Sequence, residues 1–268
     1  MSDVAVAFRD ADGPMQADLL HCLDFMNGLP FFRAYKARTW DALEITGKKR
    51  ILDVACGVGF DVIEMAKLFP RAEFVGVDRS ESFLGVARSR AAHLPNASFF
   101  SGDAVRLPFP DDSFDAARID RSLQHMTSPL AAIEEMIRVT RSGGRIVASE
   151  PDWGTFFLFN GNDEAGARMA GKWLESIANP HMGREIGQQF EKSGVEEICW
   201  RARALVLTRL YDANVVFDLP RLKKNCVAAG VLSAQEADDW QAAAERASGK
   251  GTFLACLNIF ECKGVVRK

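Results

Sequence analysis

The stretch Ile51-Leu52-Asp53-Val54-Ala55-Cys56-Gly57-Val58-Gly59-Phe60-Asp61 decides the fold class of this 268-residue chain. Its first half is a short apolar run, which is typical of a buried strand. Two glycines follow directly, and then comes an apolar helical pattern that ends at Pro70. Because glycine allows tight turns and close approach of a ligand to the backbone, the stretch predicts a strand, a glycine-rich turn and a helix.

The same order of elements continues on the carboxyl side of this stretch. Ser80 is a favourable N-cap for a helix, and Ser128 followed by Pro129 indicates the start of another helix. Strands are predicted at 50–55, 73–78, 98–103, 113–120 and 145–150, with helices at 61–69, at 80–93 and from 128 to about 142. Strand–helix repeats with short connections imply a parallel sheet that is covered by helices on both faces. The predicted class is therefore α/β, with a Rossmann-like, doubly wound sheet.

The remaining segments are less regular. Two helices are predicted within 15–46, before the first strand. After residue 150 the patterns predict an inserted loop and helix at 151–182, a helix at 184–192, a strand at 197–209, a helical segment at 213–247 and a final strand at 252–262.

Composition excludes several classes of protein. The net charge is -3 with both signs interspersed, which argues against a nucleic-acid partner. No apolar run approaches the roughly 18 residues of a membrane helix. Residues 1–14 lack the pattern of a secretory signal. The six cysteines form no CxxC pair, so we expect reduced thiols and a cytoplasmic protein.

Three predicted strand ends carry residues that suit a nucleoside ligand. In open α/β sheets, ligands bind beyond the carboxyl ends of the strands. The Gly57–Gly59 turn leads into a helix whose first N–H groups are unpaired. Asp78 ends the next strand about 20 positions later, where a carboxylate accepts from both ribose hydroxyls. Gly102-Asp103-Ala104 ends the third strand, where a carboxylate and a backbone N–H suit an adenine.

Each of these features also has a plain structural interpretation. The glycines alone are an ordinary connection, Asp78 alone is a helix cap, and Asp103 alone is a turn residue. Enzymes that bind NAD share much of the layout, but their GxGxxG pattern has a third glycine where this chain has Val62. The three sites together favour an adenosine over these alternatives, and a β-branched residue at position 62 disfavours a dinucleotide.

At these positions the sequence resembles the class I S-adenosylmethionine-dependent methyltransferases, in particular the small-molecule group with ubiquinone- and menaquinone-type enzymes. The resemblance covers about 33–150. Its first motif is Ile51–Gly59, its ribose motif is Val75–Ser80, and its adenine motif is Gly102–Ala104 with Leu107–Phe109 and Ser113–Asp115. Leu123–His125 and Arg141–Arg145 match the segments after the fourth strand and before the fifth. The sequence departs from the family pattern at two positions. Ala55 stands where the family usually has glycine, and Ser142 stands where it often has proline.

The resemblance implies S-adenosylmethionine as the cofactor and in-line transfer of its methyl group. It also implies a last strand that runs antiparallel, and an N-terminal helical lid at 1–46 that includes Tyr35 and Lys36. Residues 47–268 would then form the methyltransferase domain, with insertions at about 151–182 and 213–247. Residues implied to contact the cofactor are Tyr35, Asp53, Ala55, Gly57, Gly59, Asp78, Arg79, Gly102, Asp103, Ala104, Asp120, Arg121 and His125.

Catalysis is assigned to two candidate residues. His125, just past the fourth strand, is the better candidate for a general base, although it also suits a loop contact or a cofactor contact. Tyr35 is the second candidate, although a lid contact with the cofactor suits it better. Asp120 and Arg121 either line the cofactor pocket or form a local ion pair. The isolated histidines lack metal-ligand spacing, so no metal is expected.

The acceptor is predicted to be a small, partly apolar or aromatic metabolite. The aromatic stretch 153–159, together with Phe31 and Phe32, either walls an apolar pocket or packs a cap on the sheet. No Asn/Asp-Pro-Pro-aromatic motif of nucleic-acid methyltransferases follows the fourth strand. Two other functions stay open, a nucleotide-dependent oxidoreductase and a protein that binds S-adenosylmethionine without methylating. The chain is expected to be a monomer or a homodimer with no membrane partner.

Overall fold

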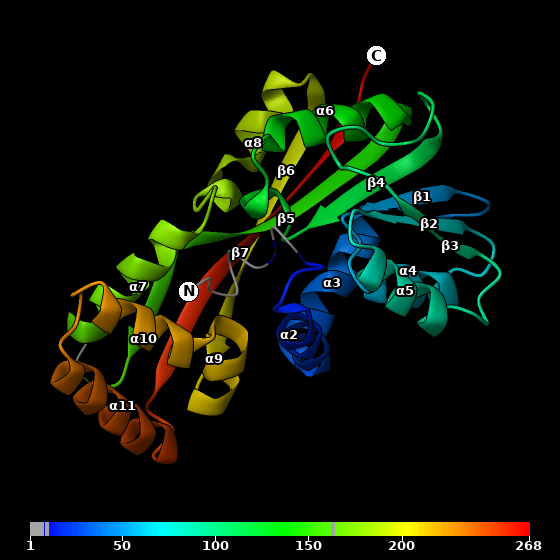
Figure 1. Ribbon diagram of the computed structural model, residues 1–268. Coiled ribbons are helices and arrows are strands. Elements are labelled where there is room, and N and C mark those ends of the chain that lie inside the picture. The colour runs from blue at the N-terminus through cyan, green and yellow to red at the C-terminus, as the bar shows by residue number, and fades with distance from the viewer. Residues whose placement is uncertain (1–7, 9–10, 162–163) are drawn as a thin grey trace.

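The computed structural model describes residue 8, residues 11–161 and residues 164–268 (Figure 1). The expectation about a secretory signal at 1–14 falls largely on residues outside this range. In the described part of the chain, no helix combines the length and the apolar character needed to cross a bilayer.

Strands of the described residues form a seven-stranded sheet with the order β3-β2-β1-β4-β5-β7-β6. β1 to β5 run parallel, and β7 runs antiparallel to both β5 and β6. The bounds are Arg50–Val54 (β1), Glu73–Asp78 (β2), Ala97–Ser101 (β3), Phe114–Asp120 (β4), Thr140–Phe159 (β5), Val195–Leu207 (β6) and Leu254–Val266 (β7). The α/β class, the Rossmann-like sheet and the antiparallel last strand are thereby confirmed.

Helices lie on both faces of the sheet and beyond its edge (Figure 1). Their bounds are Gln16–Gly28 (α2), Pro30–Ala42 (α3), Phe60–Leu68 (α4), Glu81–Arg90 (α5), Pro129–Val139 (α6), Glu164–Ser176 (α7), Met182–Lys192 (α8), Leu210–Phe217 (α9), Leu219–Ala228 (α10) and Ala234–Gly249 (α11). The Ser80 side chain caps α5 by accepting from the backbone N–H of Phe83, as its sequence position predicts.

The prediction of a loop after residue 150 was wrong. β5 continues to Phe159 and pairs with β7, with a register shift between Asp152 and Phe157. Pro151 and Gly154 suggest a break in the strand. They are tolerated because β4 ends at Asp120, opposite Ser149, so β5 has a neighbouring strand on one side only beyond that point.

This extra length gives the molecule a second region beyond the ends of β1–β4. β5, β6 and β7 run on together, and α7, α9, α10 and α11 gather around their far ends (Figure 1). Side chains on one face of these extended strands, among them Leu205, Leu257 and Ile259, pack with the helices into a separate apolar cluster. The extension therefore builds its own core next to the carboxyl ends of the parallel strands.

Candidate cofactor and substrate site

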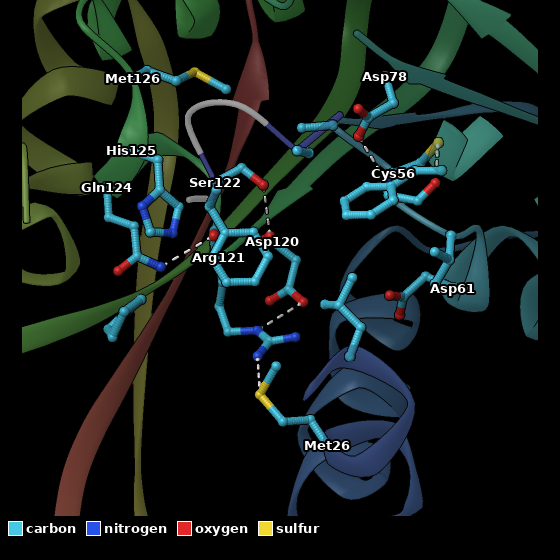
Figure 2. A pocket seen from close by; sticks show the side chains of 18 of the residues that line it. Met26, Cys56, Asp61, Asp78, Asp120, Arg121, Ser122, Gln124, His125 and Met126 are labelled. Carbon is cyan, nitrogen blue, oxygen red and sulfur yellow. Dashed lines mark hydrogen bonds and ion pairs between the residues drawn. The ribbon is translucent and has the colours of Figure 1, made fainter. Parts of the chain in front are cut away.

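A cavity of about 470 Å³ lies where the parallel strands end and the extension begins. One end of it is lined by the turn after β1, by Asp78 and by Asp103, and the other end by apolar side chains of the extension. Figure 2 shows Asp78 on one side of this pocket, with Arg121 and His125 on the other. The three strand ends singled out by the sequence thus meet at one hollow.

The turn after β1 is left-handed at three positions. Ala55, Gly57 and Gly59 have φ angles of +53°, +54° and +78°. A Cβ on Gly57 would meet no atom within 4 Å, whereas a Cβ on Gly59 would lie 2.7 Å from the Phe99 ring. Gly57 therefore leaves space open beside the cavity, while Gly59 is required by packing at the start of α4.

Asp78 connects this turn to the end of β2. Its Oδ2 accepts from the backbone N–H of Gly57 at 2.8 Å, and its Oδ1 accepts from that of Ser80 at 2.9 Å. Burial raises the pKa of Asp78, and the two backbone donors oppose that rise. Each carboxylate oxygen keeps a further acceptor site, so the residue suits a pair of hydroxyl donors.

Asp103 lies next to Asp78 at the end of β3. The backbone N–H of Gly102 donates to the carbonyl of Asp78 at 3.0 Å, which brings the two strand ends together. Asp103 Oδ1 accepts from the N–H of Val105 at 3.1 Å and so closes a local turn. Ala104 also lines the cavity. The turn role and the cavity position that the sequence left as alternatives therefore coexist.

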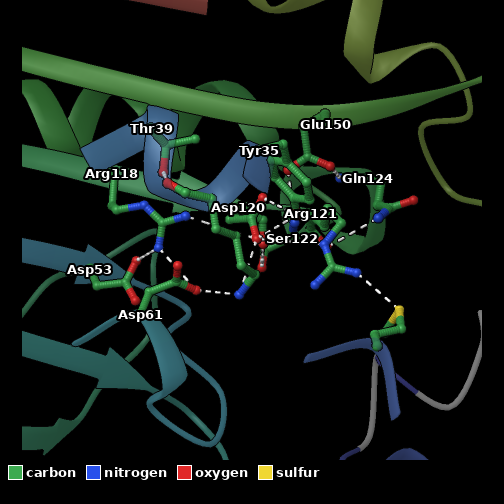
Figure 3. A network of polar contacts seen from close by, with 12 residues as sticks. Tyr35, Thr39, Asp53, Asp61, Arg118, Asp120, Arg121, Ser122, Gln124 and Glu150 are labelled. Atoms are coloured by element: carbon green, nitrogen blue, oxygen red, sulfur yellow. Dashed lines mark hydrogen bonds and ion pairs between the residues drawn. The ribbon is translucent and has the colours of Figure 1, made fainter. Parts of the chain in front are cut away.

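A network of buried charges forms part of the cavity wall, and Figure 3 shows its contacts. Arg118 Nη1 is 2.9 Å from Asp53 Oδ1 and 3.3 Å from Asp61 Oδ2, and Nη2 is 3.8 Å from Asp120 Oδ2. Lys36 contacts Asp61 and lies 3.7 Å from Asp120. Burial alone would raise the pKa of Asp61, but Arg118 and Lys36 outweigh it and hold the pKa below its usual range. The network joins α3 to β1, α4 and β4.

Tyr35 belongs to this network and does not line the cavity. Its hydroxyl donates to Asp120, at 2.9 Å from Oδ1 and 3.0 Å from Oδ2. The side chain is buried against Phe31 and Phe32. Burial raises the pKa of Tyr35 well above its usual value, so the phenol stays a donor. This position favours a role in orienting Asp120 over the predicted direct contact with cofactor or acceptor.

His125 ends a short 3-10 helix, Leu123–His125, that a buried carboxylate holds in place. Glu150 Oε1 accepts from the N–H groups of Ser122 and Leu123, each at 2.7 Å, and Oε2 accepts from that of Gln124 at 3.3 Å. The His125 ring lines the cavity and stacks on Phe8, with 5.2 Å between ring centroids. Glu150 therefore fixes the turn that presents His125.

Comparison with known proteins identifies the family of this fold and site. The sequence profile of a family described as "Methyltransferase domain" matches residues 45–194, which is more than half of the chain. A demethylmenaquinone methyltransferase of Staphylococcus aureus is 30% identical over 190 residues, covering 64% of this chain and 79% of that protein. The chain belongs to the class I S-adenosylmethionine-dependent methyltransferases.

Two further similarities describe the extent of the match. An uncharacterized 37.1 kDa protein in transposon TN4556 of Streptomyces fradiae is 32% identical over 210 residues, which cover 78% of this chain. The match spans only 61% of the length of that relative. The crystal structure of the YcgJ protein from Bacillus subtilis superposes with a TM-score of 0.63 at 20% identity, covering 88% of this chain and 99% of that one.

Most of the residues that the sequence assigned to the cofactor line the cavity. They are Asp53, Ala55, Gly57, Asp78, Arg79, Gly102, Asp103, Ala104, Asp120, Arg121 and His125. Gly59 and Tyr35 lie outside the lining. Gly59 packs against the Phe99 ring, and Tyr35 donates a hydrogen bond to Asp120. Sequence reasoning missed Arg118 and Asp61. The signal for Arg118 was a charged residue between the apolar residues Ala117 and Ile119, in the buried part of β4.

The far end of the cavity is apolar and comes mainly from elements outside the parallel sheet. Its lining includes Trp153, Trp173, Ile177, Leu205, Phe217, Leu257 and Ile259, with Met26 and Phe32 from the N-terminal helices. The two interpretations of the aromatic stretch 153–159 each hold in part. Trp153 lines the cavity, Phe156 is buried in the adjoining core, and Phe157 and Phe159 are exposed.

Proposed function

We propose that this protein transfers a methyl group from S-adenosylmethionine to a small, partly apolar or aromatic metabolite. The observation that carries the proposal is the single cavity, which joins the Asp78 and Asp103 end to the chamber lined by Trp153 and Trp173. The family assignment favours this activity over the oxidoreductase alternative. The division into an N-terminal lid at 1–46 and a domain at 47–268 remains part of the proposal.

The residues at the polar end fit the cofactor. Asp78 would accept from the ribose hydroxyls and Asp103 from the adenine amino group, as carboxylates beside strand ends can. The open space beside Gly57 leaves room for a ligand against the backbone of the turn. When bound, S-adenosylmethionine supplies a methyl group on a positively charged sulfur.

The remaining residues would act by position and by charge. The sulfonium is already activated, so placing the acceptor close to it supplies much of the rate, on the order of 7–11 kcal/mol for well-oriented groups. The apolar chamber excludes water and orients the acceptor. His125 lines the wall and would take a proton from an acceptor that carries one. Tyr35 and Lys36 keep Asp120 in place from behind.

The experiment is methyl transfer from methyl-labelled S-adenosylmethionine to small molecules of a metabolite extract, read by mass spectrometry. We expect labelled product with the wild type and a strong loss with Asp78→Ala. Tight binding of S-adenosylhomocysteine without any labelled product would instead indicate a protein that binds the cofactor but does not methylate.

A further inference from the structure

Arg121 lies at the border between the two ends of the cavity. It directly follows β4, and its guanidinium carbon lies 4.8 Å from the centre of the Phe32 ring, which faces the apolar end. On its other side is Asp120, which belongs to the polar end. A bound acceptor that reaches the cofactor from the apolar chamber would pass this side chain.

The backbone holds Arg121 there in an unfavourable conformation. Its φ angle is +51°, a left-handed value that costs a residue with a Cβ about 1–2 kcal/mol. The N–H of Arg121 donates to the carbonyl of Ser149 at 2.7 Å, and its own carbonyl accepts from Gln124 Nε2 at 3.0 Å. Strain that is held by its surroundings in this way is frequent at ligand sites.

The guanidinium has few hydrogen-bond partners in the protein for a cation whose side chain is only 18% exposed. Nε is 3.5 Å from Asp120 Oδ2, and Nη1 donates to the Met26 sulfur at 3.1 Å (Figure 2). A thioether is a weak acceptor. Among the residues that the structure describes, no hydrogen-bond partner is found for Nη2. A guanidinium has five N–H donors and matches a bidentate oxyanion, so this one retains capacity for such a group.

The local charges also favour an anion. The buried network sets Asp53, Asp61 and Asp120 against Lys36, Arg118 and Arg121, at most three charges of each sign, because burial raises the pKa of Asp53 to about 7. Asp120 is already approached by Tyr35, Lys36 and Arg118, so it does not depend on Arg121. A bound sulfonium adds one positive charge to this set, and an anionic acceptor would neutralise it.

We propose that Arg121 binds an acidic oxygen group, a carboxylate or a phenolate, on an otherwise apolar methyl acceptor. The inference rests on the proposed function and makes it more specific. It assigns Arg121 to recognition of the acceptor, whereas the family resemblance assigns it to the cofactor. The acceptor class is then a hydrophobic ring or chain with one anionic oxygen group near the methylated position.

The test compares two fluorescent probes of similar shape in the full-length protein. 1-Anilinonaphthalene-8-sulfonate carries an anionic group, and N-phenyl-1-naphthylamine is its neutral counterpart. Binding of each is measured with and without saturating S-adenosylhomocysteine for wild type, Arg121→Met and Arg209→Met. Arg209 is a highly exposed arginine and controls for probe binding at surface cations. Val216→Trp, which narrows the apolar end, checks that the probes bind in the cavity.

We expect Arg121→Met to lower the affinity for the anionic probe by about tenfold or more, because one charge-assisted hydrogen-bonded pair is lost. The affinities for the neutral probe and for S-adenosylhomocysteine should each change by less than about threefold. Arg209→Met should bind both probes like the wild type, and Val216→Trp should weaken the binding of both probes.

Three results would overturn the inference. They are equal losses for both probes in Arg121→Met, a tenfold loss of S-adenosylhomocysteine affinity with an unchanged anionic probe, and no binding of the anionic probe to the wild-type cavity. Failure of the proposed function is a separate outcome, because it appears as absent S-adenosylhomocysteine binding or absent methyl transfer in the wild type.

Discussion

Arg118 on β4 and Asp53 on β1 are register partners on neighbouring strands, with Nη1 2.9 Å from Oδ1. Their side chains are only 1% and 4% exposed. The same guanidinium lies 3.3 Å from Asp61 at the start of α4. A single cation therefore ties together elements that form the polar end of the cavity.

Replacing Arg118 by methionine should destabilise the fold strongly. The change leaves Asp53 buried without its partner, and such broken buried pairs cost about 3–5 kcal/mol. The measurement is urea unfolding. Lys67→Met removes an exposed ion pair with Glu64 and should change stability by less than about 0.5 kcal/mol. The double variant Asp53→Asn/Arg118→Met should lose less unfolding free energy than the two single variants lose in sum. A loss under about 1 kcal/mol in Arg118→Met would contradict this account of the network.

Replacing Ala55 by glycine should stabilise the protein. Ala55 has a φ of +53°, where a Cβ costs about 1–2 kcal/mol, and glycine removes that cost. Glycine also gives the unfolded chain more conformational freedom, which offsets part of the gain in stability. We expect a net gain of roughly 0.5–1 kcal/mol in chemical unfolding. Ala243→Gly, within the helix α11, is the matched control and should lose about 1 kcal/mol. Destabilisation by Ala55→Gly would show that the methyl group has a packing role that outweighs the strain.

His125→Ala should separate catalysis from binding. If the imidazole takes the acceptor proton, the transfer rate falls about 10²–10⁴-fold while S-adenosylhomocysteine affinity changes little. The checks are single-turnover methyl transfer and calorimetry on the same preparation. His93→Ala, at an exposed histidine, is the control and should behave like the wild type. A loss of cofactor affinity with an unchanged rate would instead assign His125 to cofactor binding.

Stability should depend on pH through Glu150. Burial raises the pKa of Glu150 to about 8, against the effect of the backbone N–H donors of Leu123 and Ser122. Between pH 4.5 and pH 8 the folded protein then holds a proton that the unfolded chain releases, so stability falls as pH rises. The slope from this group is at most about 1.4 kcal/mol per pH unit.

Urea unfolding of the wild type and of Glu150→Gln at pH 5 and pH 8 measures this dependence. The variant cannot ionise at this position, so its stability should fall less between the two pH values than that of the wild type. Parallel pH profiles for the two proteins would show that Glu150 keeps an ordinary pKa in the folded state.

The sequence predicts the polar end of the site better than the apolar end. The Gly57 turn, Asp78 and Asp103 were found because parallel strands bring their carboxyl ends to one edge, which is a property of the fold class. Trp173, Leu257 and Ile259 reach the cavity only because β5 and β7 extend beyond that edge, and Pro151 and Gly154 concealed the extension. Arg118 was missed because a charge in a buried strand is explained only by its neighbour across the sheet.

The measurement that tests the central claim most directly is calorimetry of S-adenosylhomocysteine and NADH binding to wild type and Asp78→Ala. We predict that the wild type binds S-adenosylhomocysteine and not NADH. Asp78→Ala should weaken that binding by about 1.5–3 kcal/mol, as expected for a lost charged hydrogen-bond acceptor. Glu73→Ala, at the exposed start of the same strand, should bind like the wild type. Tighter binding of NADH, or an unchanged affinity in Asp78→Ala, would contradict the placement of an adenosine between Asp78 and Asp103.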